Sequence, residues 1–589
     1  MCTQESRERV VQTTMRLTHT TIQPLPLPQR TNRRSQRRRN SESTASIEST
    51  DTIYFTYVVI GGGVAGTEAA KKLIALSSSC PSNTVALITP SFISDTLDKE
   101  TLTPHCQHFG ILLKNVESFS AEYPQCTIIS EYVVSIDHAA QYVTLSSGQI
   151  VSYGKLCIAT GATPKLLAVH PLVKGIRDRH SAAIFETAID KSRRICVVGN
   201  GAIALETVGC LLRQQKCQLL WVSKQTNSTH VGSSFFDPGA GEFLCAMNLM
   251  NLEHNNFSPD SFCSLSTSTG TTCNHELPQL EHSGLEWVYV STESKLDYQN
   301  NHRYDCGLGP TFKQYLHKQQ QKTSSSSTSM VREYGTTIHA ISNPIQRNDN
   351  TEFAYVWLTC GNIYACDLII SAIGVVPNLA FIHLNKYFTN RIDKDDGGLI
   401  VNAQDLCVAP NIYAAGDCTT ITSKQEHWFQ MRLWSQARAQ GHHAAMVMSD
   451  TADMHSLFHY DEIFVHHTTF WGWKVFLIGK FNQVSIEDVQ VQEEKVLPSV
   501  LSGSDTNKVN VDTITMGDGD QADIVQVLVR RSENEFCKLV LKENRLIAAV
   551  LVGNDMENAE TFENLILNGT DVSGIDLLNA QVDLADYFD

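Results

Sequence analysis

The sequence predicts an α/β protein with two Rossmann-like dinucleotide-binding domains and a small α+β domain at its C-terminus. Residues 54–76 and residues 193–212 each contain a β-branched strand, a glycine-rich turn and a helical run. From about residue 455 the pattern changes to short alternating strands followed by a helical segment. The first two stretches indicate nucleotide binding, and the change of pattern indicates a separate domain.

Composition and charge narrow the class of protein. The chain has 589 residues, 42% of them hydrophobic and 18% charged, which favours two to four domains. The net charge is -16, so the folded part is not expected to bind nucleic acid directly. No apolar run approaches the roughly 18 residues that cross a bilayer, and we expect no membrane span.

The N-terminal residues 1–52 are predicted to be a disordered basic tail. The first fifty residues hold nine Arg against four Glu and include RTNRRSQRRR at positions 30–39. Such a run suits a nuclear address. An Arg- and Ser-rich start is also typical of a mitochondrial transit peptide, and a solvated tail without an address is a third interpretation.

The first glycine-rich turn follows the strand YFTYVVI. Gly61 permits a tight turn, Gly63 lets the backbone approach a pyrophosphate, and Gly66 lets the following helix pack on the strand. The next strand, Val85 to Thr89, ends without the Asp or Glu that usually holds the ribose. The ribose contact must therefore be made differently.

The second turn repeats this order. Gly199, Gly201 and Ala204 occupy the fingerprint positions, and the helix carries Glu206. Its second strand is followed by Lys224 instead of an acid. A lysine tolerates the 2′-phosphate of NADPH better than an acid would, which slightly favours NADPH over NADH. Both nucleotides remain open as the cofactor.

Two further segments accompany the turns: KLCIATGATPK at 155–165 and NIYAAGDCTT at 411–420. With LIISAIGVVPN, which contains Gly374, they make the sequence similar to the pyridine nucleotide-disulfide oxidoreductase superfamily of two-dinucleotide-binding-domain flavoproteins. The resemblance implies two three-layer domains, one inserted in the other. It places FAD at Gly61, Gly63, Gly66, Thr160, Gly161, Gly416 and Asp417, and NAD(P)H at Gly199, Gly201, Ala204, Glu206 and Gly374. It also predicts a helix from Trp428 to Met448, with its N-terminal end at the flavin pyrimidine ring.

The resulting domain prediction has five parts. They are the tail (1–52), the first part of the FAD-binding domain (53–185), the NAD(P)H-binding domain (186–370), the second part of the FAD-binding domain (371–450) and a C-terminal α+β interface domain (455–589). The Ser- and Thr-rich residues 251–335 are expected to form a disordered insertion. The C-terminal domain is expected to hold three or four strands and a helix, and by analogy a homodimer interface.

The cysteine pattern argues against a disulfide reductase. Among 17 cysteines no C-x-x-C or C-x4-C occurs, although thiol exchange needs one attacking and one resolving sulfur. Cys106 and Cys418 are the remaining redox candidates, and both are more typical of core packing. Catalytic residues and the electron acceptor stay unassigned, and the adjacent histidines at 442–443 and 466–467 do not predict a metal site.

Two functional hypotheses follow. The first is an FAD-dependent NAD(P)H oxidoreductase, classed by family with the sulfur-acting reductases but with an open acceptor. The alternative is an NAD(P)H-sensing flavoprotein module that docks on and shields a partner. The sequence also resembles, more narrowly, a subfamily without redox cysteines. This resemblance implies localisation in the cytoplasm and nucleus. It also implies a role in the oxidative stress response and protection of the tRNA ligase complex.

Overall fold

The computed structural model describes most of the chain after the basic tail. Described are residues 52–77, 82–90, 93–176, 185, 187–214, 217–225, 235, 240–241, 243–244, 287–290, 330–383, 385–452, 459–481, 508–516, 523–532, 534–553 and 558–578. Apart from Thr52, the predicted tail lies outside these residues. In the described part, no helix is both long and apolar enough to cross a membrane.

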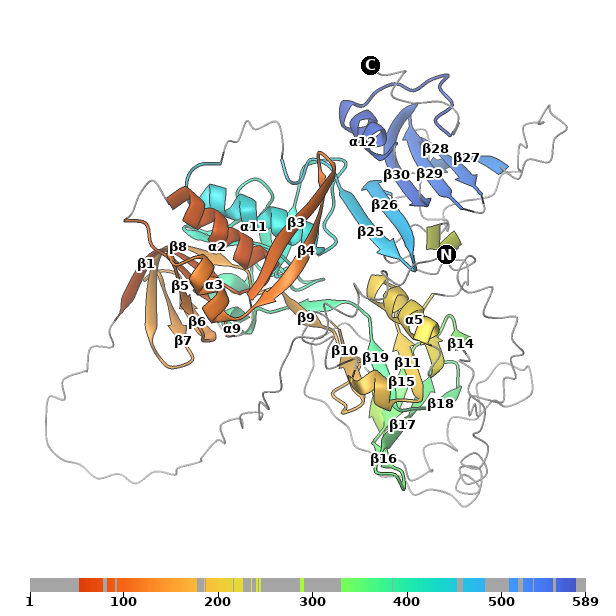
Figure 1. Cartoon of the computed structure of the whole chain (residues 1–589), viewed down its shortest axis with the longest axis horizontal. Coiled ribbons are helices and arrows are strands. Elements are labelled where there is room, and N and C mark those ends of the chain that lie inside the picture. The colour runs from red at the N-terminus through yellow and green to blue at the C-terminus, as the bar shows by residue number, and fades with distance from the viewer. Residues whose placement is uncertain are drawn as a thin grey trace, which may run out of the picture. The chain divides into compact units, whose positions relative to one another are not determined.

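The first domain is built on a sheet whose strands come from two distant parts of the chain (Figure 1). Its main path is β22 (Cys407–Ala409), β23 (Ile412–Ala414), β8 (Ile150–Ile158), β1 (Ile53–Ile60), β2 (Val85–Ile88) and β5 (Cys126–Ile129), with β6 (Val133–Asp137) and β7 (Tyr142–Leu145) attached. Pairing is parallel from β23 through β8, β1 and β2 to β5. The apolar runs of β1 and β2 are buried because both faces of this sheet are covered.

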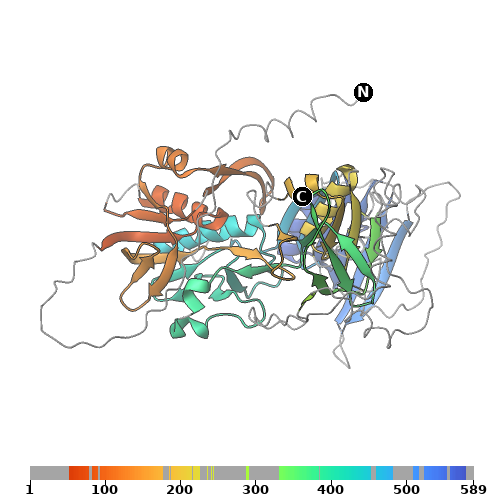
Figure 2. The ribbon, with the colours of Figure 1, turned by 90° about the horizontal axis from the view of Figure 1, so that it is seen from below.

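Two helices lie side by side in this domain, α2 (Val64–Ser77) and α11 (Trp434–Met448), as Figure 1 and Figure 2 show. Gly441 lets them approach, because a Cβ there would lie 2.1 Å from the Ala65 carbonyl oxygen. The sequence predicted that α11 begins at Trp428. This was wrong, since the helix begins at Trp434 and the preceding residues form the irregular segment described below.

The second domain has three layers. Its parallel sheet runs β10 (Val173–Gly175), β19 (Leu368–Ser371), β11 (Arg194–Val198), β12 (Gln218–Val222) and β14 (Met330–Glu333). One face packs on α5 (Ala202–Gln214), and the other packs on an antiparallel sheet. That sheet contains β13 (Trp287–Tyr289), β15 (Ile338–Ser342), β16 (Ile345–Gln346), β17 (Glu352–Leu358) and β18 (Ile363–Cys366). The predicted three-layer α/β class is confirmed.

A two-stranded crossover joins the two domains. β9 (Ala162–Pro164) pairs antiparallel with β20 (Val375–Pro377), so the chain leaves the first domain and returns to it along one ribbon. This is the insertion of one dinucleotide fold in the other that the resemblance implied.

Two details of the predicted domain limits need correction. β10 lies in the second sheet, although residues up to 185 were assigned to the first domain. β13 and β14 are strands within the segment 251–335 that was predicted to be disordered. Both strands gain their partners from distant residues, which local composition does not reveal. The rest of that segment, apart from residues 290 and 334–335, lies outside the described residues.

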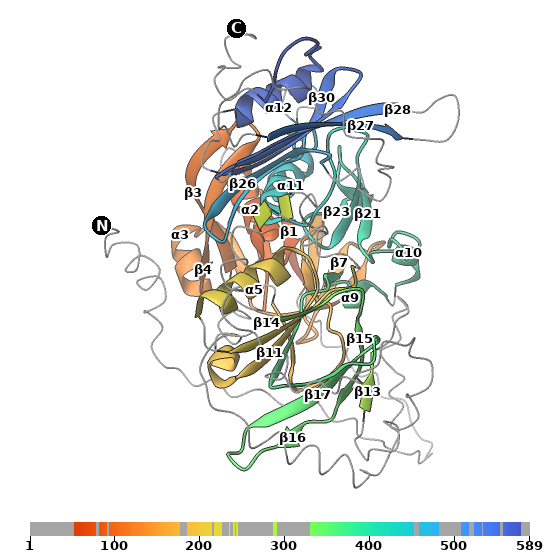
Figure 3. The same cartoon turned by 90° about the vertical axis from the view of Figure 1, so that its right-hand side faces the viewer.

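The C-terminal domain has more strands than the three or four predicted. Its antiparallel sheet runs β25 (Val465–Phe470), β26 (Trp473–Gly479), β30 (Arg545–Gly553), β29 (Phe536–Lys542), β28 (Asp523–Arg531) and β27 (Lys508–Met516). Helix α12 (Ala559–Asn568) packs on this sheet (Figure 3). The expected α+β character is therefore present, with six strands in the sheet.

The C-terminal domain contacts both nucleotide domains through specific side chains. Trp471 donates from Nε1 to the Leu205 carbonyl oxygen at 3.0 Å. In the first domain, a hairpin of β3 (Ile93–Thr103) and β4 (Cys106–Lys114) reaches α12, where His105 Nδ1 lies 2.6 Å from Glu563 Oε1. These contacts give the C-terminal domain defined polar partners in each nucleotide domain.

Candidate nucleotide-binding sites

The three glycines of the first glycine-rich turn have different surroundings. Gly61 has φ +112°, and a Cβ there would lie 2.2 Å from the Ala159 carbonyl oxygen. A Cβ at Gly66 would lie 1.9 Å from the Gly61 carbonyl oxygen, so only glycine lets α2 pack this closely. At Gly63 a Cβ would meet nothing within 4 Å. The turn is therefore tight at its base and open at the start of α2, the arrangement that suits a dinucleotide pyrophosphate.

The second turn has the same construction. Gly199 has φ +132°, and a Cβ there would lie 2.1 Å from the Ala372 carbonyl oxygen. Gly201 again has open space within 4 Å of the Cβ position, and Ala204 is fully buried in the helix contact. Glu206 reaches solvent from α5, but crowding by nearby atoms partly desolvates it and raises the pKa of its carboxyl group. The residues present fit a second dinucleotide.

The second strands of the two turns, β2 and β12, are followed by Thr89 and Ser223 and not by an acidic residue. Thr89 is 1% exposed, and a Cβ added at Gly62 would lie 2.6 Å from its Oγ1. It therefore packs beneath the turn and is not accessible to a ligand. At the corresponding end of β12, Lys224 is exposed and forms no ion pair with the other described residues.

A polar cluster surrounds Asp417 at the start of the returning segment. Gly416 has φ +80° and donates its N–H to Gln440 Oε1 at 2.7 Å. Asp417 is 5% exposed, and its carbonyl oxygen accepts from Arg432 Nε at 3.1 Å. Arg432 also donates from Nη2 to Asp396 Oδ2 at 2.7 Å, so one guanidinium ties two chain segments together.

The N-terminal end of α11 lies directly after Arg432. The residue at its N-cap, Leu433, makes no side-chain cap, and the first turn contains no acidic residue. The positive end of the helix is therefore not neutralised locally. This fits the electron-rich pyrimidine edge of a flavin.

Thr160, Gly161 and Gly374 meet at the crossover. Thr160 Oγ1 donates to the Asn378 carbonyl oxygen at 2.8 Å, and Asn378 Nδ2 donates back to the Thr160 carbonyl oxygen at 3.0 Å. Gly161 and Gly374 have φ +64° and +98°, with open space at both Cβ positions. The Thr160 hydroxyl is thus used in a hydrogen bond within the protein. Gly374 lies near the second turn, because Ala372, two residues before it, contacts Gly199.

Three residues of this arrangement were not among the sequence-predicted site residues: Asn378, Arg432 and Gln440. Asn378 is, with Gly374 and Pro377, one of the residues that match the family in the motif LIISAIGVVPN, but no ligand role is predicted for it. Arg432 and Gln440 carry no local motif, because their partners lie 15 and 24 residues earlier in the chain. The ligand roles of all predicted site residues remain predictions.

Cys106 and Cys418, the two cysteines considered as redox candidates, are poorly suited to thiolate chemistry. Burial, together with the negative charge of Glu563, raises the pKa of Cys106 to about 12. Burial also raises the pKa of Cys418, whose Sγ donates to the Ile158 carbonyl oxygen at 3.3 Å. All 11 cysteines of the described residues are free thiols.

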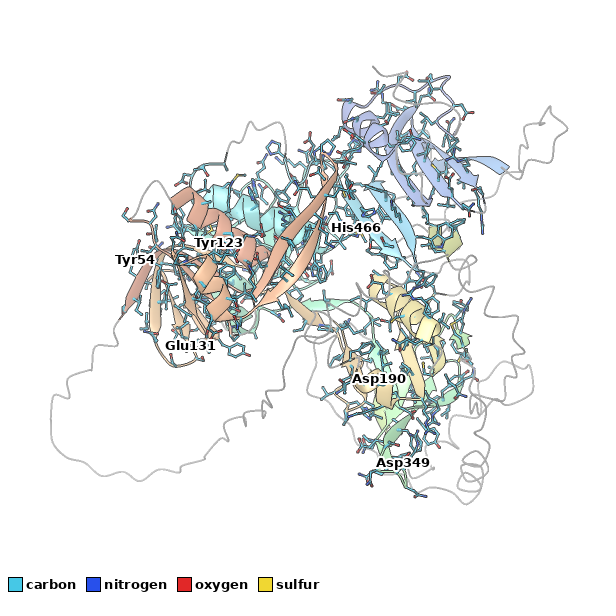
Figure 4. All side chains as sticks on the ribbon, viewed as in Figure 1. Tyr54, Tyr123, Glu131, Asp190, Asp349 and His466 are labelled. Atoms are coloured by element: carbon cyan, nitrogen blue, oxygen red, sulfur yellow. The ribbon has the colours of Figure 1, made fainter. Side chains whose placement is uncertain are left out.

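The paired histidines do not converge on a common point. His466, labelled in Figure 4 on β25, packs its ring edge-on against Phe235 with centroids 5.9 Å apart. His467 contacts Phe476 and His108 instead. Burial lowers the pKa of both histidines to about 4. Among the described residues no cluster of His, Cys, Asp and Glu could hold a metal ion.

Two glycine-rich turns on interleaved three-layer domains define a two-dinucleotide flavoprotein. The sequence profile of the pyridine nucleotide-disulphide oxidoreductase family matches residues 55–244 and 313–441. The chain belongs to this family. Its cofactors are therefore FAD and NAD(P)H, and its activity is of the oxidoreductase type.

Individual relatives match almost end to end. Pyridine nucleotide-disulfide oxidoreductase domain-containing protein 1 of Rattus norvegicus is 31% identical over 571 residues, covering 91% of this chain and 98% of the relative. The Homo sapiens protein of the same name is 30% identical over 563 residues, covering 90% and 98%. That of Danio rerio is 31% identical over 566 residues, covering 90% and 97%.

Solved structures support the fold. The putidaredoxin reductase–putidaredoxin covalent complex has a chain that matches with a TM-score of 0.51 and 15% identity, covering 88% of this chain and 94% of that one. The ferredoxin reductase of the CYP199A2 system from Rhodopseudomonas palustris gives 0.50 and 17%, covering 84% and 91%. At these identities the likeness concerns the fold alone.

Proposed function

We propose that this protein is an FAD-dependent NAD(P)H oxidoreductase that works without a redox-active disulfide. The proposal rests on one observation: the same glycine-rich turn occurs in each of the two domains that the β9–β20 ribbon joins. Each turn is closed at its first glycine by a backbone carbonyl, from Ala159 or Ala372, and is open at its second. One chain therefore presents two pyrophosphate cradles on domains that a single ribbon links.

The chain's own groups would bind and orient the two nucleotides. The N-terminal ends of α2 and α5 offer backbone N–H groups to the phosphates. The uncapped N-terminus of α11 favours negative charge on the flavin pyrimidine edge. When bound, FAD would take a hydride from NAD(P)H and pass the electrons to an acceptor.

The thiols support an acceptor other than a cysteine pair of this chain. Cys106 and Cys418 are buried with raised pKa values, so neither is a ready nucleophile. Electrons would then leave the flavin directly. Oxygen, a quinone-like molecule, another protein or a disulfide elsewhere are acceptors of suitable chemistry.

Steady-state oxidation of NADPH and NADH by the FAD-loaded protein tests this function. We expect turnover with a soluble quinone that stops when FAD is removed, and a modest preference for NADPH. Mutation of Cys106 and Cys418 to Ser should leave the rate within about twofold, since neither thiolate takes part. Absence of any FAD-dependent oxidation with every acceptor would refute the proposal.

We further propose, from the narrower resemblance, a role in the oxidative stress response in cytoplasm and nucleus and protection of the tRNA ligase complex. The basic segment at residues 30–39 supports a nuclear address. A pull-down with and without NAD(P)H tests the partner, and localisation of the chain with and without residues 1–52 tests the address. Capture that requires NAD(P)H, combined with negligible turnover, would favour the docking module over the enzyme.

A homodimer is proposed on the C-terminal sheet. β27 is the end strand of that sheet, and an edge strand offers unpaired backbone groups to a second copy. Light scattering of the purified protein measures the mass. A monomer at micromolar concentration would exclude this assembly.

A further inference from the structure

A separate cavity lies between the segment Ile421–Gln430 and Lys480, just after β26. Its volume is about 450 Å³, within the range of small-molecule sites. Its lining residues are Ile421, Ser423, Gln425, Trp428, Phe429, Gln430 and Lys480. None of the residues assigned to the two nucleotide cradles lines it.

The cavity wall contains donors without protein partners. Trp428 is 5% exposed, and its indole N–H makes no hydrogen bond to the described residues; the ring itself meets Tyr460 edge-on at 6.1 Å. Lys480 is half-buried and forms no ion pair with the described residues. The indole N–H is not among the fully buried polar atoms that lack a partner, so it remains open to an acceptor from solvent or a ligand. Here the cavity is where an acceptor would fit.

Two further polar side chains of the wall, Gln430 and Ser423, are already engaged. Gln430 Oε1 accepts from the Ile421 N–H at 2.9 Å, and its Nε2 donates to the Thr419 carbonyl oxygen at 3.1 Å. Ser423 Oγ donates to the buried carboxylate of Asp461 at 2.7 Å. These bonds fix the wall and leave Trp428, Lys480 and the exposed side-chain amide of Gln425 as donors for a ligand.

The charges around the cavity favour an anion at the Lys480 end. Burial lowers the pKa of the His427 imidazole; the charge of Lys480 adds to this shift and that of Glu426 opposes it. His427 is therefore neutral near neutral pH. Asp461 accepts the hydrogen bond of Ser423, and Glu426 is exposed. Lys480 is thus the one charged side chain among the lining residues.

We propose that this cavity binds a small planar aromatic anion. The ring lies against Trp428 and Phe429, and the acid group accepts hydrogen bonds from Lys480 Nζ and Trp428 Nε1. Phe429 is held in place for this contact by its stacking on Phe464, at 4.3 Å between centroids. The inference concerns binding alone and does not depend on oxidation of NAD(P)H.

Calorimetric titration of the FAD-loaded, full-length protein with naphthoate and with its neutral amide tests the site. Naphthoate should bind at least about tenfold more tightly than naphthamide, because only the acid can pair with Lys480. Lys480→Met should weaken naphthoate about tenfold and leave naphthamide nearly unchanged. Trp428→Phe should weaken both probes, since it removes the indole N–H and part of the ring contact.

Lys474→Met is the matched control, because Lys474 is exposed on β26, the strand that Lys480 follows, and does not line the cavity. It should bind naphthoate as the parent protein does. Equal affinity for acid and amide, no heat with naphthoate, or an unchanged affinity in Lys480→Met would each overturn the proposal. Competitive displacement of naphthoate by NAD⁺ would also overturn it, since it would place the probe in the nicotinamide site.

Discussion

Arg432 donates from Nε to the main-chain carbonyl oxygen of Asp417 at 3.1 Å, from a backbone with φ +54°. A left-handed conformation costs free energy for a non-glycine residue, so the surroundings must hold it there. The same guanidinium binds Asp396, and α11 begins two residues later. Arg432 thus fixes both Asp417 and the helix end assigned to the flavin.

Arg432→Met should weaken FAD binding about tenfold, because a charge-assisted bond contributes about 1.5 kcal/mol or more. Fluorescence titration of the apoprotein with FAD measures the affinity. The visible spectrum of the bound flavin should also shift, a change that loss of stability alone would not cause. Arg213→Met, at an exposed arginine on α5, is the control. Parental FAD affinity and spectrum in Arg432→Met would contradict the assigned role.

Gly63→Val and Gly201→Val should separate the two cofactor sites. Both positions have open space at Cβ, so a side chain blocks the ligand without a clash inside the protein. Gly63→Val should lose FAD, whereas Gly201→Val should keep FAD and lose at least about tenfold in NAD(P)H affinity. Flavin content and nicotinamide titration give the two readings. Loss of NAD(P)H binding alone in Gly63→Val would reverse the assignment of the turns.

Gly441→Ala should destabilise the protein although alanine is the better helix former. The added Cβ would lie 2.1 Å from the Ala65 carbonyl oxygen, and overpacking typically costs about 1–3 kcal/mol. Urea unfolding followed by circular dichroism measures the change. Gly201→Ala, which has room for its Cβ, should lie within about 0.5 kcal/mol of the parent. A more stable Gly441→Ala protein would mean that α2 and α11 are not in close contact.

His105 should stabilise the fold most at low pH. Burial lowers the pKa of His105, but the hydrogen bond and charge of Glu563, with Glu462, outweigh it and raise that pKa above 6.5. A raised histidine pKa gives stability that is complete below the unfolded value and is lost as pH rises through the folded value. His105→Asn should therefore lose more unfolding free energy near about pH 5.5 than near about pH 9.

Thermal or urea unfolding at the two pH values, with His108→Asn as an exposed control, checks this linkage. A loss that is the same at both values, or larger at the higher one, would show that the His105–Glu563 pair carries no proton-linked stability.

Features that depend on neighbouring residues could be predicted from the sequence, whereas features that depend on contacts between distant residues could not. Gly61 and Gly199 need glycine for φ angles set within one strand–turn–helix unit, so the motif alone locates them. The carbonyl groups that close the two turns, from Ala159 and Ala372, come from distant strand ends. β10, β13 and β14 depend on pairing with residues far along the chain. Arg432 likewise acquires its role from the carbonyl of Asp417. The start of α11 was misplaced because residues 428–433 also include helix-forming residues.

The most direct test of the central claim is the visible spectrum of the purified protein during anaerobic titration with NADPH and then NADH. The account predicts a flavin band near ~450 nm that bleaches with nicotinamide and returns when air is admitted. Rapid return would indicate ready electron transfer to oxygen, and slow return a reduced complex that persists. A colourless protein that does not bind added FAD, or a flavin band that neither nucleotide bleaches, would contradict the account.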